Sequence, residues 1–117
     1  MKREVKERLK FQVYCPHLNR DVFLRSEIWH GKICQWHDEM KSKINLVKNI
    51  IENESVEVVK VRKISNHKEV SIFSKVPDFH PYGTQIRIGL KVIDDTKAEI
   101  WTAHQTSNDL PSGMETI

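Results

Sequence analysis

Cysteine is scarce in this chain, which has only Cys15 and Cys34 among its 117 residues. Small secreted domains that depend on disulfide bonds usually contain more cysteines. The N-terminal residues are charged and contain no apolar segment of the kind found in signal peptides. Every apolar run is far shorter than a membrane-spanning helix requires. We therefore expect a cytoplasmic protein with two reduced thiols and no contact with a membrane.

The familiar catalytic signatures are also missing. The sequence contains no glycine-rich phosphate-binding loop, no nucleophile elbow and no metalloprotease histidine pair. It contains no internal repeat, linker or low-complexity segment. We therefore expect a single domain over residues 1–117, with a core at about 9–106 and a loose tail over 107–117.

The composition is that of an ordinary globular protein, with 38% hydrophobic and 30% charged residues. The net charge of +3, counted with neutral histidines, permits a polyanionic partner without requiring one. Six histidines are present, and histidine is the side chain whose ordinary pKa lies closest to neutrality.

Apolar and polar residues alternate with the period of a β-strand in several segments. These segments are residues 9–15, 22–24, 56–62, 70–76, 85–93 and 98–106. The first two are separated by a turn and predict a hairpin. The last four follow one another without an intervening helix and predict an antiparallel meander.

Between these two groups the apolar residues recur at helical spacing. Ser26 is the expected N-cap of a first helix, whose apolar residues are Ile28, Trp29, Ile33, Trp36 and Met40. Asp38 either interrupts this helix or caps the next one. Residues 41–53 predict the second and clearest helix. The predicted fold is α+β, with an N-terminal β-hairpin and two helices packed on a four-stranded antiparallel meander sheet.

Polar side chains alternate along the last two predicted strands. Thr102, His104 and Thr106 share one face of the last strand. Arg87 and Lys91 project from the polar side of the strand before it. If the two sets share a face, they offer an imidazole, hydroxyls and cations for metal-free RNA cleavage. An ordinary solvated sheet face explains the same alternation, and the residues alone favour that interpretation.

A second candidate lies at the joint between the helices, where His37 precedes Asp38 and Glu39. An imidazole beside a carboxylate can act as a general acid or base. A surface histidine near a helix end is the simpler interpretation.

A third candidate combines two thiols with two imidazoles, the soft ligands of a tetrahedral zinc site. Its members are Cys15, His17, Cys34 and His37. The spacing of one residue between the first two is tight, and two buried cysteines explain the pattern better.

Three tryptophans could stack on the bases of a nucleic acid. They are Trp29, Trp36 and Trp101. Burial in a small core is the commoner role of tryptophan.

Several short motifs together resemble one family of nucleases. They are Tyr14-Cys15-Pro16, Arg20 to Leu24, Glu27-Ile28-Trp29, Ile33, His37 to Met40, and Thr102 to Thr106. Over about residues 12–110, their order and spacing resemble the phage-associated branch of the barnase–EndoU–colicin–RelE-like nucleases. Members typically have a short hairpin with a Cys-Pro pair, a helix with tryptophan and histidine, and a closing strand with threonines around a tyrosine.

The resemblance implies a metal-independent endoribonuclease of phage or toxin type, a hydrolase that needs no cofactor. It implies RNA as the substrate and allows a cognate inhibitor protein as a partner. On this analogy His37 and His104 would be the proton-transfer pair. Lys32 and Arg87 would hold phosphate, and Thr102 would orient it. The site would lie on the open face of the sheet, close to the first helix.

The chain departs from the family pattern at several positions. Lys32 stands where the first helix histidine of the family usually lies, and Asp38 replaces a proline. Lysine can stabilise a phosphate but is a poor base at neutral pH. His104 replaces a tyrosine and keeps the capacity for proton transfer. These changes leave open a catalytically inactive module that binds nucleic acid or protein, and, as a third class, a zinc-stabilised interaction domain.

Overall fold

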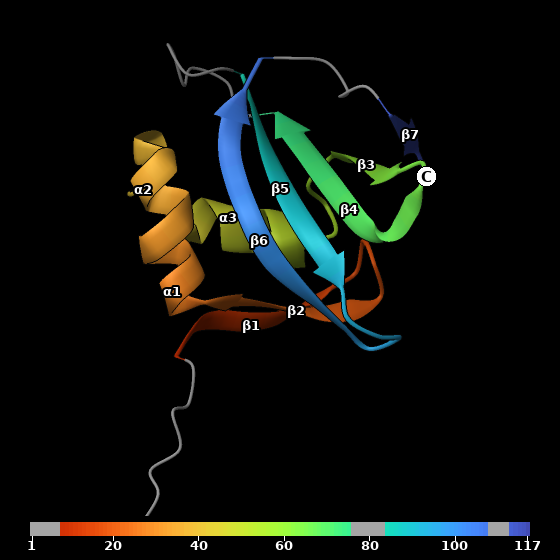
Figure 1. Ribbon diagram of the computed structural model, residues 1–117, viewed down its shortest axis with the longest axis horizontal. Coiled ribbons are helices and arrows are strands. Elements are labelled where there is room, and N and C mark those ends of the chain that lie inside the picture. The colour runs from red at the N-terminus through yellow and green to blue at the C-terminus, as the bar shows by residue number, and fades with distance from the viewer. Residues whose placement is uncertain (1–7, 76–83, 108–112) are drawn as a thin grey trace, which may run out of the picture.

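The strands of the chain join into one seven-stranded sheet in the order β1-β2-β6-β5-β4-β3-β7 (Figure 1). The computed structural model describes residues 8–75, 84–107 and 113–117. The strands are β1 (Leu9–Cys15), β2 (Arg20–Arg25), β3 (Val58–Lys63), β4 (Asn66–Lys75), β5 (Gln85–Val92), β6 (Lys97–Thr106) and β7 (Met114–Thr116).

The predicted α+β class is confirmed, but the predicted four-stranded sheet is wrong. β3 to β6 do form an antiparallel meander of consecutive strands. The N-terminal hairpin joins the same sheet, because β2 pairs in parallel with the first residues of β6. β7 pairs with β3 in the segment expected to be a loose tail, of which residues 108–112 lie outside the described ones. Both additions pair strands far apart in sequence, which local periodicity does not report.

The first predicted helix is a broken helical segment, residues 26–40. It consists of α1 (Ser26–Ile28), a π-helical turn (Trp29–Ile33), α2 (Cys34–Trp36) and a 3₁₀ turn (Asp38–Met40). The expected N-cap at Ser26 is wrong, because Ser26 is the first helical residue and Arg25 precedes it as N-cap. The backbone N–H of Ser26 instead donates to the carbonyl of Arg8, at 2.7 Å.

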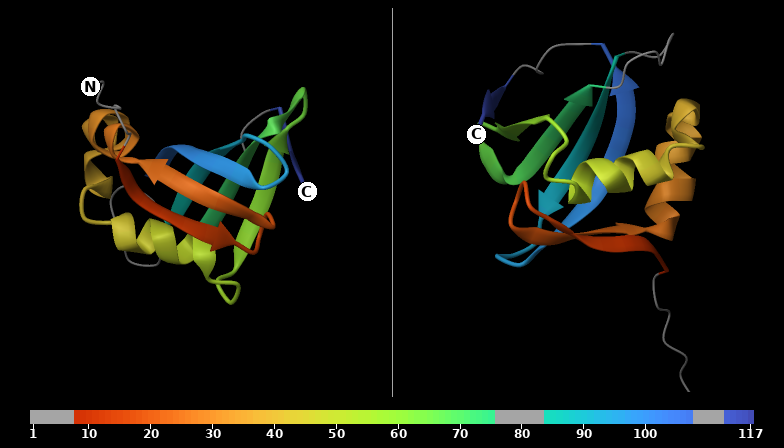
Figure 2. Two further views of the ribbon diagram at one scale, coloured as in Figure 1. Left: turned by 90° about the horizontal axis from the view of Figure 1, so that it is seen from below. Right: turned by 180° about the vertical axis from the view of Figure 1, so that it is seen from behind.

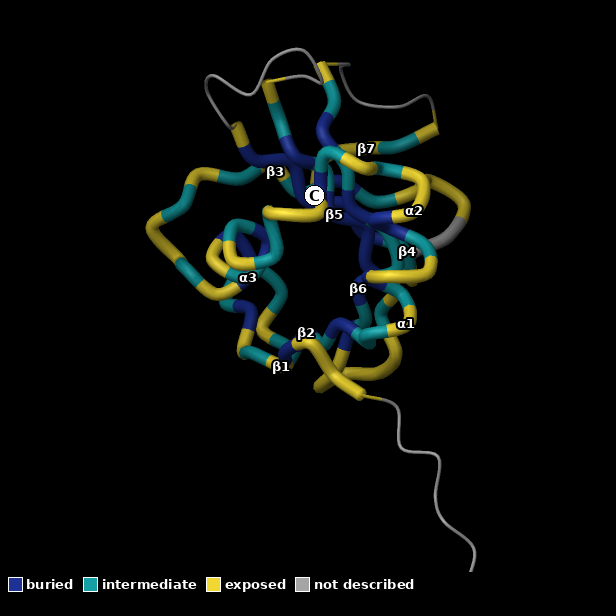
Figure 3. The backbone as a smooth tube through the Cα atoms, turned by 90° about the vertical axis from the view of Figure 1, so that its left-hand side faces the viewer, coloured by how far each residue is buried: buried dark blue, intermediate teal, exposed yellow. Residues whose placement is uncertain are grey.

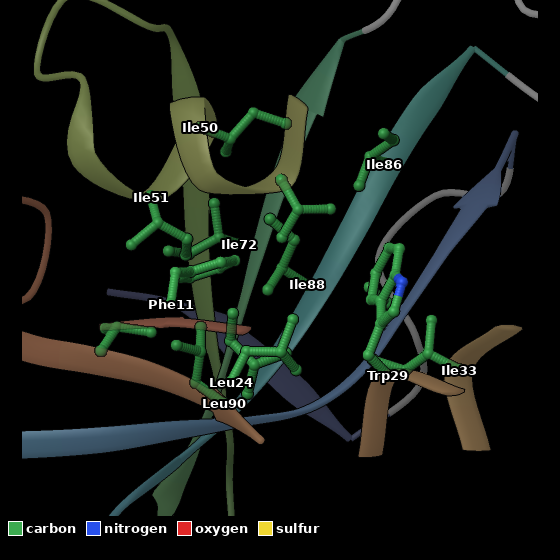
Figure 4. Close-up of a cluster of buried hydrophobic side chains, with 14 of the residues drawn as sticks. Phe11, Leu24, Trp29, Ile33, Ile50, Ile51, Ile72, Ile86, Ile88 and Leu90 are labelled. Carbon is green, nitrogen blue, oxygen red and sulfur yellow. The ribbon is translucent and has the colours of Figure 1, made fainter. Parts of the chain in front are cut away.

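The second predicted helix is α3 (Ile44–Glu52), shorter at both ends than the expected 41–53. Its buried residues are Val47, Ile50 and Ile51. Seen from behind, α3 lies across β4, β5 and β6 (Figure 2). Ile50 and Ile51 lie close to Ile72 of β4 and Ile88 of β5, all of them within the buried cluster (Figure 4). This face of the sheet therefore holds the core.

The burial pattern separates the two faces of β5 and β6, whereas residues 70–74 of β4 are buried on both faces. Buried positions gather in β4, β5 and β6, and exposed ones on loops and outer helical turns (Figure 3). On β5, Ile86, Ile88 and Leu90 are fully buried toward the core, as the alternation predicts. Within the described residues, no helix crosses the opposite face of β4 to β6 (Figure 1). We refer to this opposite side of β4, β5 and β6 as the open face.

Both cysteines are free and buried. Among the described residues, no helix has the length and apolar character needed to span a bilayer.

Candidate active site

The helical segment lies along the part of the β6 edge that β2 does not pair with. β2 pairs with β6 only over residues 97–99, whereas β6 continues to Thr106. Beyond that point Lys32 donates through Nζ to the carbonyl of Trp101 at 2.7 Å. The carboxylate of Glu39 accepts the backbone N–H of Gln105 at 3.2 Å. These two side chains satisfy backbone groups that a neighbouring strand would otherwise pair, and they hold the segment against β6.

His37 lies in the chain between these two attachments, directly after α2. Its ring stacks on that of His104, with centroids 4.8 Å apart and planes at 24°. His104 is on the open face of β6, opposite Arg87 of β5 in the strand register. Two residues 67 positions apart are therefore brought into contact by the docking of the helical segment.

The surroundings of His104 favour its neutral form. The pKa of His104 is lowered from 6.5 to about 4, chiefly because burial penalises the charged ring. The neighbouring His37 and Arg87 lower this pKa further, and Glu39 opposes them. Nδ1 of His104 is buried and has no hydrogen-bond partner in the described part of the chain. At neutral pH His104 therefore has a ring nitrogen able to accept a proton.

Arg87 is held beside this pair by the neighbouring strand β4. Its Nε donates to the hydroxyl of Ser71 at 3.1 Å, and its guanidinium lies 5.9 Å from the ring centroid of Phe73. Burial lowers the pKa of Arg87, while Glu69 raises it. A partly buried guanidinium fixed in this way is suited to an anion that approaches the open face.

A β-bulge interrupts the pairing of β5 with β6 close to the histidine pair. Gly89 opposes Thr102 and Leu90 opposes Ile100, so Trp101 is the extra residue. A Cβ on Gly89 would lie 2.6 Å from Cγ2 of Thr102 and 3.3 Å from Nε1 of Trp101. Only glycine at this position lets both side chains lie so close to β5. The bulge was not predicted, although the buried Ile100 and Ala103 are three residues apart instead of two.

The sequence-predicted nuclease residues lie in one region of the molecule. His37, Arg87 and His104 form one group; at the neighbouring bulge, Lys32 contacts Trp101 and Thr102 faces Gly89. The sequence did not identify the two attachments at Trp101 and Glu39, because both are contacts between the helical segment and β6.

The predicted zinc set is not assembled. His17 contacts the carbonyl of Ile50 through Nε2, at 3.0 Å, while His37 stacks on His104. Within residues 8–75, 84–107 and 113–117 no three metal-binding side chains of the His, Cys, Asp or Glu type gather around a common point. The cysteines serve the core, with Cys15 fully buried and Cys34 nearly so.

The three tryptophans have different surroundings. Trp29 is buried in the core, and Trp101 lies under the ammonium group of Lys32. Trp36 is 74% exposed at the end of α2, next to His37. Of the three, Trp36 is the one whose ring is available to stack on a base.

No family model, no curated protein and no solved structure matches this chain. The resemblance to the nuclease family stays a prediction that rests on the short motifs.

Proposed function

We propose that the chain is a metal-independent endoribonuclease whose proton-transfer pair is His37 and His104. The contact between the two imidazoles at 4.8 Å, beside Arg87, carries the proposal. A histidine on an ordinary solvent-exposed sheet face is not held neutral by its surroundings. His104 is held neutral, by burial and by the neighbouring cation Arg87. Titratable groups perturbed in this way gather at functional sites.

The neutral ring of His104 is suited to act as the base. It takes the proton of a ribose 2′-hydroxyl, and the 2′-oxygen attacks the adjacent phosphorus. The bond from phosphorus to the 5′-oxygen breaks, and that oxygen takes a proton from His37. The products are a 2′,3′-cyclic phosphate and a 5′-hydroxyl. Rings stacked at 4.8 Å can each serve one of the two apical oxygens of a single phosphorane.

Arg87 supplies positive charge where the phosphorane gains negative charge. The bound phosphate also acts on the base. A negative charge near His104 favours its protonated form, so substrate binding raises its pKa from about 4 toward the pH of the reaction.

The second candidate is a module that binds RNA without cleaving it. A pKa of about 4 makes His104 a weak base in the empty site, and among the described residues no carboxylate accepts a hydrogen bond from its Nδ1. The same surface would then serve binding alone.

Cleavage of a mixed, fluorescently labelled RNA pool in the presence of EDTA tests the proposal. We expect the wild type to cleave the RNA. We expect His37→Ala and His104→Ala to lower the rate by roughly 10²- to 10⁴-fold each, the usual contribution of a general acid or base.

His30→Ala is the matched control, because His30 is an exposed histidine of the same helical segment that contacts Lys10 instead of β6. It should leave the rate unchanged. Absence of cleavage by the wild type would favour the binding module, and equal rates in all the variants would contradict the roles of His37 and His104.

A further inference from the structure

Two ammonium groups lie over the indole ring of Trp101 on the open face. Nζ of Lys32 is 4.1 Å from the ring centroid, and Nζ of Lys91 is 5.5 Å from it. Lys32 comes from the helical segment and Lys91 from β5, so the pair exists only because that segment docks on β6. An ammonium over an indole face gains a favourable cation–π contact.

This arrangement is held by the backbone around the bulge. Lys32 is fixed by its hydrogen bond of 2.7 Å to the carbonyl of Trp101. The indole itself rests against Gly89, where a Cβ would lie 3.3 Å from Nε1 of the ring. Lys32 is therefore placed by the fold, whereas Lys91 is an exposed lysine of β5 whose ammonium group reaches the same indole ring.

The acidic residues nearest in the register are engaged with other cations. Glu99, which faces Lys91 across β5 and β6, forms an ion pair with Arg25. Glu69, which faces Lys91 across β4 and β5, lies 3.9 Å from Lys63. Burial and the charge of Lys91 both lower the pKa of Lys32. The charges of Lys32 and Lys91 repel each other, and an anion bound near both would relieve that repulsion.

We propose that Lys32 and Lys91 form a second phosphate subsite, for the phosphate next to the one held at His37 and His104. The inference rests on the proposed function and deepens it. Trp101 and Thr102 precede His104 on β6 by three and two positions, respectively. Two residues of a strand span roughly 7 Å. Consecutive phosphates of an extended strand are separated by a similar distance. The preferred substrate is therefore a single strand with at least two phosphates.

This assignment refines the role expected for Lys32. Arg87, which faces His104 directly, is the cation of the reacting phosphate. Lys32 and Lys91 bind and orient the neighbouring one.

Binding of short deoxyoligonucleotides tests the subsite without any cleavage, because they lack the attacking 2′-hydroxyl. The probes are a labelled dinucleotide with one phosphate and a labelled trinucleotide with two, followed by fluorescence anisotropy at several salt concentrations. We expect Lys91→Ala to weaken binding of the trinucleotide and to reduce its salt slope by about 0.7, the value for one phosphate contact on a single strand. Binding of the dinucleotide should not change.

Lys48→Ala is the control for loss of one positive charge, because Lys48 belongs to α3 on the other side of the sheet and pairs with Glu52 at 3.5 Å. It should leave both slopes unchanged. An unchanged slope in Lys91→Ala, an equal loss with both probes, or no binding of either probe would overturn the subsite.

The outcomes also separate the subsite from the catalysis. If the trinucleotide depends on Lys91 but RNA is not cleaved, the subsite stands and the ribonuclease proposal fails. If RNA cleavage depends on His37 and His104 but Lys91→Ala changes nothing, the ribonuclease stands and the subsite fails.

Discussion

The ionisation of His104 links the stability of the fold to pH. Its pKa falls from 6.5 to about 4 on folding, so between these values the unfolded chain binds a proton that the folded chain does not. Stability from this residue is therefore complete above about pH 6.5 and is lost as the pH falls toward 4. One proton accounts for at most about 1.4 kcal/mol per pH unit.

The variant His104→Gln removes this titration while keeping a polar side chain. We expect the wild type to lose more stability than the variant between pH 6.5 and pH 4, as measured by urea unfolding at a series of pH values. Parallel losses in the two proteins would show that His104 is not the residue that couples folding to pH.

At the scale of elements, the bulge between β5 and β6 determines where the side chains of the site point. Ala98 and Ile100 face the core before it, and Ala103 faces the core after it. Trp101 and Thr102 are adjacent in sequence, yet both are only partly buried and both approach Gly89. The bulge therefore keeps His104 on the open face. Simple alternation predicts the same face for His104 and Thr102, because they are two residues apart.

Gly89→Ala tests this close approach. We expect a loss of about 1–3 kcal/mol in the free energy of unfolding, because the new methyl group would meet Cγ2 of Thr102 at 2.6 Å. Denaturant unfolding measures the loss.

Gly31→Ala is the matched control, because a Cβ there meets nothing within 4 Å. Since alanine is the better helix former, this variant should gain up to about 1 kcal/mol. Equal effects of the two substitutions would contradict the described packing of the bulge.

The limits of prediction from sequence are also clearest at this scale. The strand Leu9–Cys15 and the side-chain alternation of β5 follow directly from local periodicity. Periodicity also put His104 and Thr102 on one face. It could not reveal the stacking of His37 on His104, because that contact depends on how the helical segment docks on β6.

At the scale of the whole molecule, the N-terminal hairpin is part of the main core. Val22 and Leu24 of β2 are fully buried in the same cluster as Ile88 of β5 and Ile50 of α3. The parallel pairing of β2 with β6 closes this arrangement. From the sequence the hairpin was expected to pack on the four-stranded meander sheet and not to join it, because nothing in its local pattern specifies a partner 76 residues further along the chain.

Leu24→Ala tests whether the molecule unfolds as one unit. We expect a loss of about 2–5 kcal/mol and a single transition that far-ultraviolet and near-ultraviolet circular dichroism report at the same denaturant concentration. Leu9→Ala, at a position that is 46% exposed, should change stability by less than about 0.5 kcal/mol. Two separate transitions in Leu24→Ala would mean that the hairpin unfolds independently.

The central claim is that the imidazoles of His37 and His104 cleave RNA through its 2′-hydroxyl. The most direct measurement uses a deoxyoligonucleotide with one internal ribonucleotide, incubated with the protein in EDTA, and identifies the ends of the products. We predict a single cut after the ribonucleotide, with a 2′,3′-cyclic phosphate on one product and a 5′-hydroxyl on the other. Cuts at deoxyribose positions, 5′-phosphate ends, or an intact oligonucleotide would contradict the claim.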